Sequence, residues 1–405
     1  MHRLTTLLGM PQHRFVSIHV VGTNGKSSVT RMVAALLEAH GVSAGACVSP
    51  HAARWSERTL IHGREIGAAD FAAAVERAAQ AAEAVNRGLD EGEAVTQFEL
   101  ATAATFVAFA SARVKAAAVE AGLGGRLDAT NTIPSRVTVL TSVGLDHTQW
   151  LGETEEEIAA EKLAVLRDHS VLVLGRVRPA VAELAERTAR KRGARLIVAA
   201  EDPGPEVRLR ARGRFQRRNF ALACAAAEVF LGGLDAGLAG EVAAEIEVPG
   251  RLEQVSTDPP AYLDAAHNPD AAAALAEALP ELAGGRPVVC CLAILREKDV
   301  KAVVEGLRPV VDRVICSELR EVPRAVAAKS GAVGATAERP TLTAGELASL
   351  CAEAGLKAEV EPDLALAVER GRELAGEVDG VLLVSGSHYA LDTARHILGR
   401  LPGTS

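Results

Sequence analysis

Residues 17–28 have the sequence Ser17-Ile18-His19-Val20-Val21-Gly22-Thr23-Asn24-Gly25-Lys26-Ser27-Ser28. The apolar run from Phe15 to Val21 predicts a buried strand. After Lys26, apolar residues recur with the spacing of one helix face, and Gly41 predicts the helix end. This order predicts a phosphate-binding loop, because loop N–H groups and a helix N-terminus attract an anion and Lys26 adds a positive charge.

The match to the general phosphate-loop pattern is incomplete, since Val20 stands where that pattern has a glycine. The alternative interpretation is a glycine turn with a solvated lysine. The predicted strand before the turn and the predicted helix after it favour phosphate binding. Phosphate binding alone does not define the reaction.

The size and charge of the chain limit its class. A chain of 405 residues is too long for one ordinary hydrophobic core, so we predict two domains. Hydrophobic residues make up 48% and charged residues 24%, as in globular proteins. The net charge of −8, without an extended basic run, argues against nucleic acid as a partner. No apolar stretch resembles a cleavable signal or could span a bilayer, so we expect a cytoplasmic protein with no membrane partner.

The six cysteines form no Cys-x-x-Cys pair, and five of them stand among apolar neighbours. This pattern predicts reduced thiols in the core of a cytoplasmic protein.

The predicted elements alternate as in an α/β protein. Strands are expected at 15–21, 42–48, 115–120, 137–141 and 207–212, with helices after the phosphate loop, at 68–88, at 98–109, from Thr154, and at 220–231. The pattern breaks at Pro249-Gly250 and then restarts with strands at 261–264, 287–293, 312–316, 357–361 and 380–385 and helices at 270–282, 299–308, 344–354 and 363–375. We therefore predict a domain over 1–249 and a smaller α/β domain with a mostly parallel sheet over 250–405.

Polar residues follow four of the predicted strands, at Gly22, Ser49, Glu120 and Asp146-His147. Ligands bind at the carboxyl edge of open α/β sheets. Ser49, Glu120 and His147 are therefore candidate ligands of a Mg²⁺ ion that bridges nucleotide phosphates. Each residue alone has a structural alternative, since Ser49 could cap a turn, Glu120 could pair with Arg126, and His147 could be a loop histidine. Their shared edge favours the metal site.

The chain resembles the folylpolyglutamate synthase/dihydrofolate synthase family of the Mur ligase superfamily. The matching segments follow one another through nearly the whole chain: 19–26, Ser49-Pro50-His51, Glu57-Arg58, 96–99, 120–131, 146–148, Glu161-Lys162, Gln216, Asn219, 249–251, 264–269 and Gly386-Ser387. The segment Gly-Leu-Gly-Gly-Arg-Leu-Asp-Ala-Thr-Asn is the most specific of these, whereas the phosphate loop is common to all Mur ligases.

The resemblance implies a Mur-ligase-like P-loop domain followed by a Rossmann-like domain, with ATP between them. It also implies an amide ligase in which a folate or dihydropteroate carboxylate attacks the γ-phosphate of ATP. L-Glutamate then displaces phosphate from the acyl phosphate. Phosphoryl transfer depends mainly on neutralising charge, which Lys26 and Mg²⁺ would supply. By resemblance we expect a monomer.

The resemblance also implies roles for individual residues. The ATP-binding residues would be Gly22, Thr23, Asn24, Gly25, Lys26, Ser27, Asn219, Arg251 and Asp264. One Mg²⁺ would be held by Ser49 and Glu120 and a second by His147 and a carbamylated Lys162. Thr96, Phe98 and Asp128 match the pteridine pocket, and His267 and Ser387 match positions linked to glutamate. Lys26, Lys162 and His147 would be the catalytic residues.

The residues around Lys162 decide whether its amine is buried, which the expected carbamate requires. On a helix that begins near Thr154, Lys162 shares a face with Ile158, Val165 and Leu166, so the face should pack inward. The alternative is a lysine whose stem lies along this face while its amine reaches water. Burial would instead lower the pKa and leave a neutral amine able to add carbon dioxide.

Two features depart from the family pattern. Ser27 stands where the folate enzymes commonly have glycine and the cell-wall Mur ligases have serine. Family members also carry a glycine-containing lead-in before the stretch that matches Leu4 to Pro11, part of which encloses the pterin.

Two other functions are therefore alternatives. One is another Mur-type amino-acid ligase, such as a UDP-muramyl ligase, against which the Gly-Leu-Gly-Gly-Arg-Leu-Asp-Ala-Thr-Asn segment argues. The other is a nucleotide-binding protein without ligase activity, against which His147, Lys162, Asp264 and His267 argue.

Overall fold

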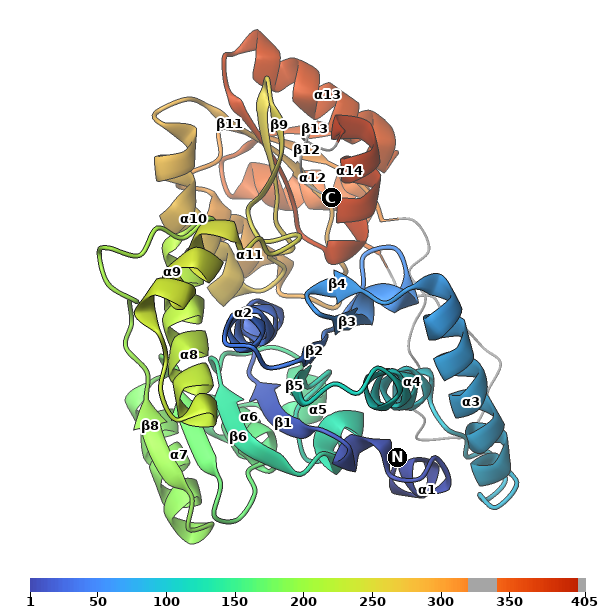
Figure 1. The fold of residues 1–405 in the computed structure, drawn as a ribbon. Helices are drawn as coiled ribbons and strands as arrows, with labels where there is room; N and C mark the ends of the chain where they lie inside the picture. The colour runs from blue at the N-terminus through green and yellow to red at the C-terminus, as the bar shows by residue number, and fades with distance from the viewer. Residues whose placement is uncertain (320–340, 400–405) are drawn as a thin grey trace. The chain divides into compact units, whose positions relative to one another are not determined.

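The computed structural model describes residues 1–319 and 341–399, which form two compact α/β units. The first unit contains residues 1–210 and 216–246. The described part of the second contains residues 211–215, 247–319 and 341–399. Each unit is built around its own sheet (Figure 1). The α/β class predicted from the alternating pattern is confirmed.

The sheet of the first unit has eight strands in the order β4-β3-β2-β5-β1-β6-β7-β8. The strands are β1 (Val16–Val21), β2 (Ala44–Cys47), β3 (Thr59–Ile61), β4 (Arg64–Glu65), β5 (Ala116–Glu120), β6 (Ser135–Leu140), β7 (Val171–Leu174) and β8 (Arg195–Val198). β2, β5, β1, β6, β7 and β8 run parallel, whereas β3 and β4 extend the sheet as antiparallel strands. The central strand β1 lies between β5 and β6, so the loop that follows it lies at the middle of the carboxyl edge.

Helices of the first unit pack on this sheet and on one another. They are α1 (His2–Leu7), α2 (Lys26–Ala39), α3 (Ala68–Asn86), α4 (Gln97–Ser111), α5 (Thr148–Leu151), α6 (Glu155–Leu163), α7 (Pro179–Lys191), α8 (Arg214–Leu231) and α9 (Ala236–Glu245), with 3₁₀ turns η1 (Pro11–His13), η2 (Trp55–Arg58) and η3 (Ala129–Thr132). α2 contacts β1, β2 and β5, and α3 packs along α4. The predicted capping box at Thr154 and Glu157 is present at the start of α6.

The sheet of the second unit has six strands in the order β13-β12-β11-β14-β10-β9. The strands are β9 (Glu253–Thr257), β10 (Pro260–Leu263), β11 (Val288–Leu292), β12 (Arg313–Cys316), β13 (Lys357–Val360) and β14 (Val381–Ser385), and only β9 pairs antiparallel. The helices are α10 (Pro269–Ala283), α11 (Val300–Leu307), α12 (Ala344–Glu353), α13 (Leu364–Glu377) and α14 (Leu391–Leu398), with η4 (His388–Ala390). The mostly parallel sheet was predicted; β9 and α14 were not.

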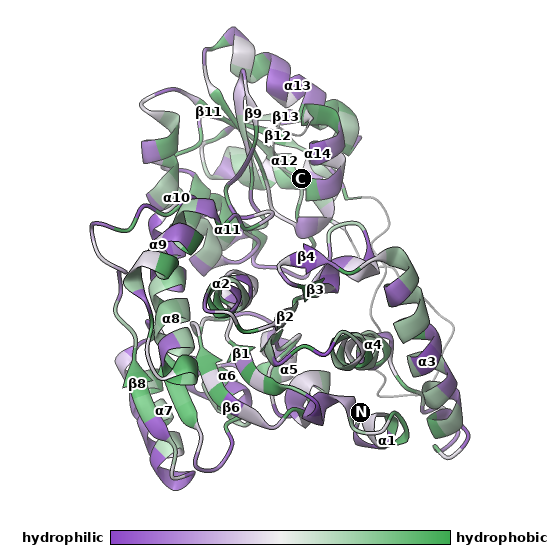
Figure 2. Cartoon of the chain, viewed as in Figure 1, coloured by the Kyte–Doolittle hydropathy of each residue, from purple (hydrophilic) through white to green (hydrophobic). Residues whose placement is uncertain are grey.

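The helix α13 carries both apolar and hydrophilic residues (Figure 2). In the second unit, two core clusters contain alternate residues of the same strands, such as Cys290 in one and Cys291 in the other. This alternation is what a sheet covered on both faces requires. Five of the six cysteines are buried and none forms a disulfide. No helix in the described residues is long and apolar enough to cross a membrane.

The strand predicted at 207–212 is wrong. Residues 207–212 do not pair with a strand, because their backbone groups bond other parts of the chain. The N–H of Arg210 donates to the carbonyl of Ala243 at the end of α9, and Arg217 Nη1 donates to the carbonyl of Val207. One edge of the first sheet is instead formed by β8, which follows α7, and neither β7 nor β8 was predicted.

Candidate active site at the phosphate loop

The loop from Gly22 to Gly25 joins the carboxyl end of β1 to the first turn of α2. Hydroxyl residues that follow β6 hold it in place. Thr141 Oγ1 donates to the carbonyl of Asn24 over 2.6 Å, and the N–H of Asn24 donates to Ser142 Oγ over 3.0 Å. Thr23 is tied through its N–H to the carbonyl of Ser142. The loop is therefore preorganised by its neighbour strand, and Thr141 and Ser142 were not identified from the sequence.

Two glycines of the loop meet side chains at close range. A Cβ at Gly22 would lie 1.9 Å from Thr141 Oγ1, and a Cβ at Gly25 would lie 2.5 Å from Asn219 Oδ1. Gly25 also has φ of +84°, a conformation that glycine adopts without strain. Asn219, one of the predicted ATP-binding residues, therefore lies against the loop and donates a 3.0 Å hydrogen bond to Gln216.

Gly25→Ala is expected to lower ATP-dependent turnover at least about tenfold, because the methyl group would displace Asn219 and distort the loop. Gly41→Ala is a matched control, since Gly41 has φ of +78° and no atom within 4 Å of an added Cβ. Both variants should lose about 1 kcal/mol of unfolding free energy through backbone strain. Turnover and urea unfolding of the two variants check this, and equal turnover in both would contradict it.

Lys26 is the first residue of α2, and its Nζ donates to the carbonyl of Thr23 over 3.0 Å. This bond folds the side chain back over the loop, so that its charge lies with the loop N–H groups. The arrangement matches the predicted phosphate cradle.

Ser27, Ser49 and Glu120 come together at the carboxyl ends of β1, β2 and β5. Ser27 Oγ donates to Glu120 Oε1 over 2.9 Å and to the carbonyl of Ser49 over 3.1 Å. The N–H of Ser49 donates to Glu120 Oε2 over 2.9 Å. Only 2% of Glu120 is exposed. The sequence alternative in which Glu120 pairs with Arg126 is wrong, because Arg126 instead bonds Glu161.

These oxygen donors suit a hard cation. Mg²⁺ is usually held by one or two carboxylates together with substrate phosphates and water. Among residues 1–319 and 341–399 no group of three or more His, Cys, Asp or Glu side chains could hold a metal ion by itself. Glu120 with the hydroxyl of Ser27 and the carbonyl of Ser49 therefore fits a metal that also binds a nucleotide.

Lys162 is buried at the end of α6, with 4% exposed, beside the same loop. Its Nζ donates to the carbonyl of Gly22 over 2.9 Å. Burial and the charge of Lys26 lower the pKa of Lys162 from its ordinary value to about 7. The predicted burial is confirmed, since Ile158, Val165 and Leu166 are also buried, but the predicted shared helix face is not, because α6 ends at Leu163 and Val165 and Leu166 follow it.

Asp146 and His147 follow β6 and immediately precede α5. His147 has φ of +55°, its N–H donates to Asp146 Oδ1 over 3.0 Å, and its Nε2 lies 3.9 Å from that oxygen. The charge of Asp146 favours the protonated form of Lys162, so the two groups influence one another. The carboxyl edge of the sheet thus carries the four predicted positions Gly22, Ser49, Glu120 and Asp146-His147.

Two of the predicted pteridine residues, Phe98 and Asp128, lie at the loop after β5. Phe98 packs against Gly122, where an added Cβ would lie 2.4 Å from the ring. Asp128 accepts the N–H of Leu123 over 2.8 Å and both the N–H and the hydroxyl of Thr130. Burial raises the pKa of the Asp128 carboxyl. Asp128 therefore shapes this loop through its own hydrogen bonds, whatever it contacts in a ligand.

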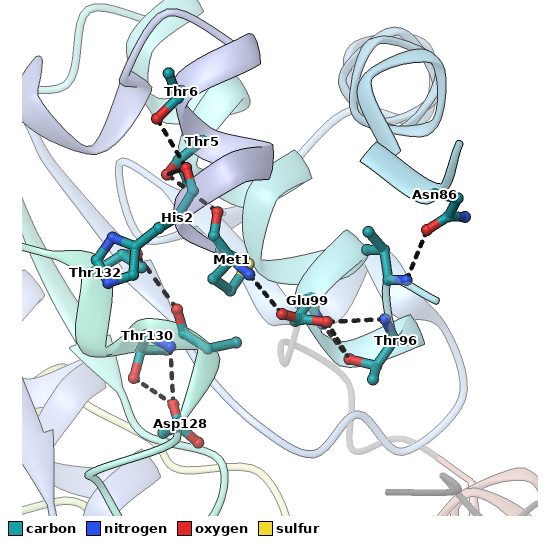
Figure 3. A network of polar contacts seen from close by, with 12 residues as sticks. Met1, His2, Thr5, Thr6, Asn86, Thr96, Glu99, Asp128, Thr130 and Thr132 are labelled. Carbon is teal, nitrogen blue, oxygen red and sulfur yellow. Dashed lines mark hydrogen bonds and ion pairs between the residues drawn. The ribbon is translucent and has the colours of Figure 1, made fainter. Parts of the chain in front are cut away.

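Thr96 lies at the N-terminus of α4 in a capping box with Glu99. Glu99 also accepts a 2.6 Å ion pair from the amino group of Met1, and Figure 3 shows this network beside the Asp128–Thr130 contacts. The local role of Thr96 as a helix cap was not predicted. Its predicted contact with a substrate stays a prediction.

His51, Trp55 and Arg58 form a cluster next to Phe98 that was not predicted from the sequence. Arg58 lies 4.6 Å from the ring centre of Trp55 and 5.8 Å from that of Phe98. Its Nε donates to His51 Nδ1 over 2.8 Å, and the rings of His51 and Trp55 are 4.6 Å apart. The spacing of His51, Trp55 and Arg58 was the available signal, because 3₁₀ and helical turns bring such residues to one side.

Asp264, His267 and Ser387 follow the parallel neighbours β10 and β14, and Arg251 precedes β9, the antiparallel neighbour of β10, so all four lie at the carboxyl edge of this sheet. Asp264 accepts the N–H groups of Leu252 and Ala266 over 2.9 and 2.8 Å, and burial raises its pKa. Arg251 Nη1 bonds the carbonyl of Gly250. His267 Nδ1 lies 2.7 Å from the carbonyl oxygen of Ala265, and Ser387 caps η4.

Comparison with known proteins gives the family. Residues 20–209 match the Mur ligase middle domain, and residues 250–388 match the Mur ligase glutamate ligase domain. A Mycobacterium tuberculosis protein named dihydrofolate synthase/folylpolyglutamate synthase is 35% identical over 377 residues, which cover 82% of this chain and 76% of that protein.

Two solved structures extend the likeness. The M. tuberculosis folylpolyglutamate synthase complexed with ADP has a TM-score of 0.88 and 31% identity, covering 99% of this chain and 94% of the other. The bifunctional folylpolyglutamate synthase/dihydrofolate synthase of Yersinia pestis complexed with AMPPNP and a Mn ion has a TM-score of 0.78 and 27% identity, covering 98% and 92%. With its phosphate loop and these matches over both units, the chain belongs to the folylpolyglutamate synthase/dihydrofolate synthase family of Mur ligases.

Proposed function

We propose that this chain is an ATP-dependent ligase that joins L-glutamate to the carboxylate of a folate or of dihydropteroate. The observation that carries the proposal is the carboxyl edge of the first sheet. There Lys26, Glu120 and Lys162 all lie at the phosphate loop, and the chain belongs to a family of folate–glutamate ligases.

In this proposal the loop N–H groups and Lys26 bind the phosphates of ATP. The substrate carboxylate oxygen attacks the γ-phosphorus, ADP leaves, and an acyl phosphate forms. The glutamate amine then attacks the acyl carbon, so that phosphate leaves and an amide bond remains. The chain's contribution is position and charge, since the bonds change between the substrates.

Two Mg²⁺ sites belong to the proposal. Ser49 and Glu120 would hold one ion and His147 with a carbamylated Lys162 the other. Bound Mg²⁺ would neutralise the phosphate charge. Support for the first site is that Glu120 accepts hydrogen bonds from the hydroxyl of Ser27 and from the N–H of Ser49, so the three residues lie together.

The remaining predicted residues receive roles by resemblance. Asn219, Arg251 and Asp264 would contact the nucleotide, Thr96, Phe98 and Asp128 the pterin ring, and His267 and Ser387 the glutamate. Residues 1–249 would act as the P-loop domain and residues 250–405 as the Rossmann-like domain. We also propose a cytoplasmic monomer without a nucleic-acid or membrane partner.

The test is release of phosphate from ATP with three substrate pairs. They are dihydropteroate with glutamate, tetrahydrofolate with glutamate, and a UDP-muramyl acid with its amino acid. Release with either of the first two supports the proposal and shows which reaction occurs. Release only with the third would identify another Mur-type ligase, and none with any pair would favour a nucleotide-binding protein.

Glu120→Gln is expected to raise the Mg²⁺ concentration needed for half-maximal turnover at least about tenfold, because a carboxylate ligand is lost. Glu120 accepts one hydrogen bond from the hydroxyl of Ser27 and one from the N–H of Ser49. In glutamine an NH₂ group replaces one of the two accepting oxygens, so one of these donors would face another donor. That mismatch should cost about 1–3 kcal/mol of unfolding free energy. Mg²⁺ titration and urea unfolding measure the two effects. An unchanged Mg²⁺ requirement would remove Glu120 from the metal site.

A further inference from the structure

A basic cavity lies on the first unit, away from the phosphate loop. It has a volume of about 460 Å³ and is lined by Leu8, Gly9, Pro11, Arg14, Arg77, Val107, Ala110, Ser111, Arg113, Val114 and Lys115. Cavities of this size hold small organic ligands. Its walls come from the end of α1, from η1, from α3 and from the end of α4, and α1, α3 and α4 lie together in Figure 1.

The cavity is at the opposite edge of the sheet from the phosphate loop. Arg14 precedes β1, and Lys115 precedes β5, whereas Gly22 and the loop follow β1. The six residues of β1 span about 20 Å at the usual rise per residue. A ligand in this cavity therefore occupies a second site and does not share the residues of the proposed active site.

The charges of the cavity have one sign. Arg14, Arg77, Arg113 and Lys115 line it, and no acidic residue does. In the described part of the chain, none of these four side chains forms an ion pair, although the protein as a whole carries a net charge of −8. Arg77 is oriented toward the cavity wall by a 3.3 Å bond from Nη2 to the carbonyl of Leu8. Cations gathered without counter-charges repel one another, and an anion would relieve that repulsion.

The floor of the cavity is apolar. Leu8, Pro11, Val107 and Val114 are buried, whereas all four cationic residues are exposed. An inorganic ion would use only the cations, but an organic anion would use the floor as well.

Arg113 occupies a backbone position that favours glycine. It follows the helix α4 with φ of +55°. The N–H of Val114 bonds the carbonyl of Phe109 and the N–H of Arg113 bonds that of Ala110, which together form a Schellman motif. Glycine is the usual residue at this position of the motif, so arginine is strained there. Replacement of Arg113 with glycine would therefore remove the charge without straining the backbone.

We propose that this cavity binds a small organic anion with at least two phosphate or carboxylate groups, at a site separate from the active site. The cations bind the charged groups and the apolar floor contacts the rest of the molecule. The proposal goes beyond the proposed ligase function and does not depend on it.

The test uses the full-length Lys26→Ala protein, in which the phosphate loop has lost its lysine. Calorimetric titration with pyrophosphate and, separately, with citrate should show one saturable site per chain that weakens as salt is raised. Binding of pyrophosphate alone would indicate a phosphorylated ligand, and binding of citrate would indicate that carboxylates suffice. Absence of saturable binding with both probes would overturn the proposal.

Two further variants in the same background test the residues. Arg113→Gly should weaken binding at least about tenfold, since a charged hydrogen-bond donor is lost. It should fold at least as well, because glycine suits the backbone there. Arg14→Gln should also weaken binding. Lys191→Gln, on α7 outside the cavity, is the matched control and should bind as before. Unchanged binding in the variant with both Arg113→Gly and Arg14→Gln would also overturn the proposal.

Discussion

Replacement of Lys26 with alanine is expected to lower ATP-dependent turnover about 100- to 1000-fold, the usual effect of removing one preorganised donor to transition-state charge. Its Nζ lies over the phosphate loop, where it bonds the carbonyl of Thr23. Negative charge shifts among the phosphate oxygens during phosphoryl transfer, and a fixed cation stabilises it without covalent participation. Alanine is compatible with the first turn of the helix, but it leaves only the loop N–H groups to stabilise the phosphate charge.

The fold should survive this change. Lys26 is the first residue of α2 and its side chain is only partly buried, so its removal leaves no large cavity. The melting temperature should stay within about 2–4 °C of the original value, equivalent to at most about 1 kcal/mol in a protein of this size. Phosphate release with saturating substrates and a thermal melt are the measurements, with Lys191→Ala as an exposed-lysine control. Full turnover in a folded Lys26→Ala protein would show that the loop is only a glycine turn.

Much of the fold could be predicted because its signals are local. The strand–glycine–helix order around Lys26 and the capping box at Thr154 each depend on a few consecutive residues. The failure at 207–212 has the opposite cause. Alternation there resembles a strand, but the backbone partners are Ala243 and the side chain of Arg217, which are distant in the sequence.

In the candidate site, too, local signals could be predicted and contacts between distant residues could not. Glu120 was found from its place after a strand, yet its bonds to Ser27 and Ser49 needed the sheet order β2-β5-β1, which the sequence does not state. Thr141 and Ser142 follow a strand as well, but they act by bonding the backbone of Asn24 in the loop. Such backbone partners cannot be recognised from residue types. The basic cavity joins residues from three separate stretches of the sequence, 8–14, Arg77 and 107–115, so no motif marks it.

Replacement of Lys162 should have a comparable effect for a different chemical reason. With its pKa lowered to about 7, the amine is largely neutral above neutral pH and has a lone pair. The amine nitrogen can then attack the carbon of carbon dioxide; one proton leaves, and a carbamate anion forms. The nearby charge of Lys26, which disfavours a second cation, favours this anion. Its two oxygens suit Mg²⁺ in the way that Glu120 does.

We therefore expect Lys162→Ala and Lys162→Met to lose at least about 100-fold in turnover, and acetate to restore part of it in the alanine variant, where the missing stem leaves space. Lys162→Met should fold at least as well as the original protein, because it fills the site without burying a charge. Removal of carbon dioxide and bicarbonate from the buffer should lower the activity of the original protein and leave both variants unchanged.

A second measurement separates the carbamate from a plain lysine. With ¹³C-labelled bicarbonate, the original protein should show a carbamate carbon signal that Lys162→Met lacks. At a fixed concentration of dissolved carbon dioxide, this signal should grow as the pH rises through about 7, since only the neutral amine reacts. A simple buried lysine would give no such signal and no dependence on carbon dioxide. Because Lys162 Nζ already bonds the carbonyl of Gly22, loss of turnover alone could reflect a disturbed loop, whereas the labelled signal reports the covalent change itself.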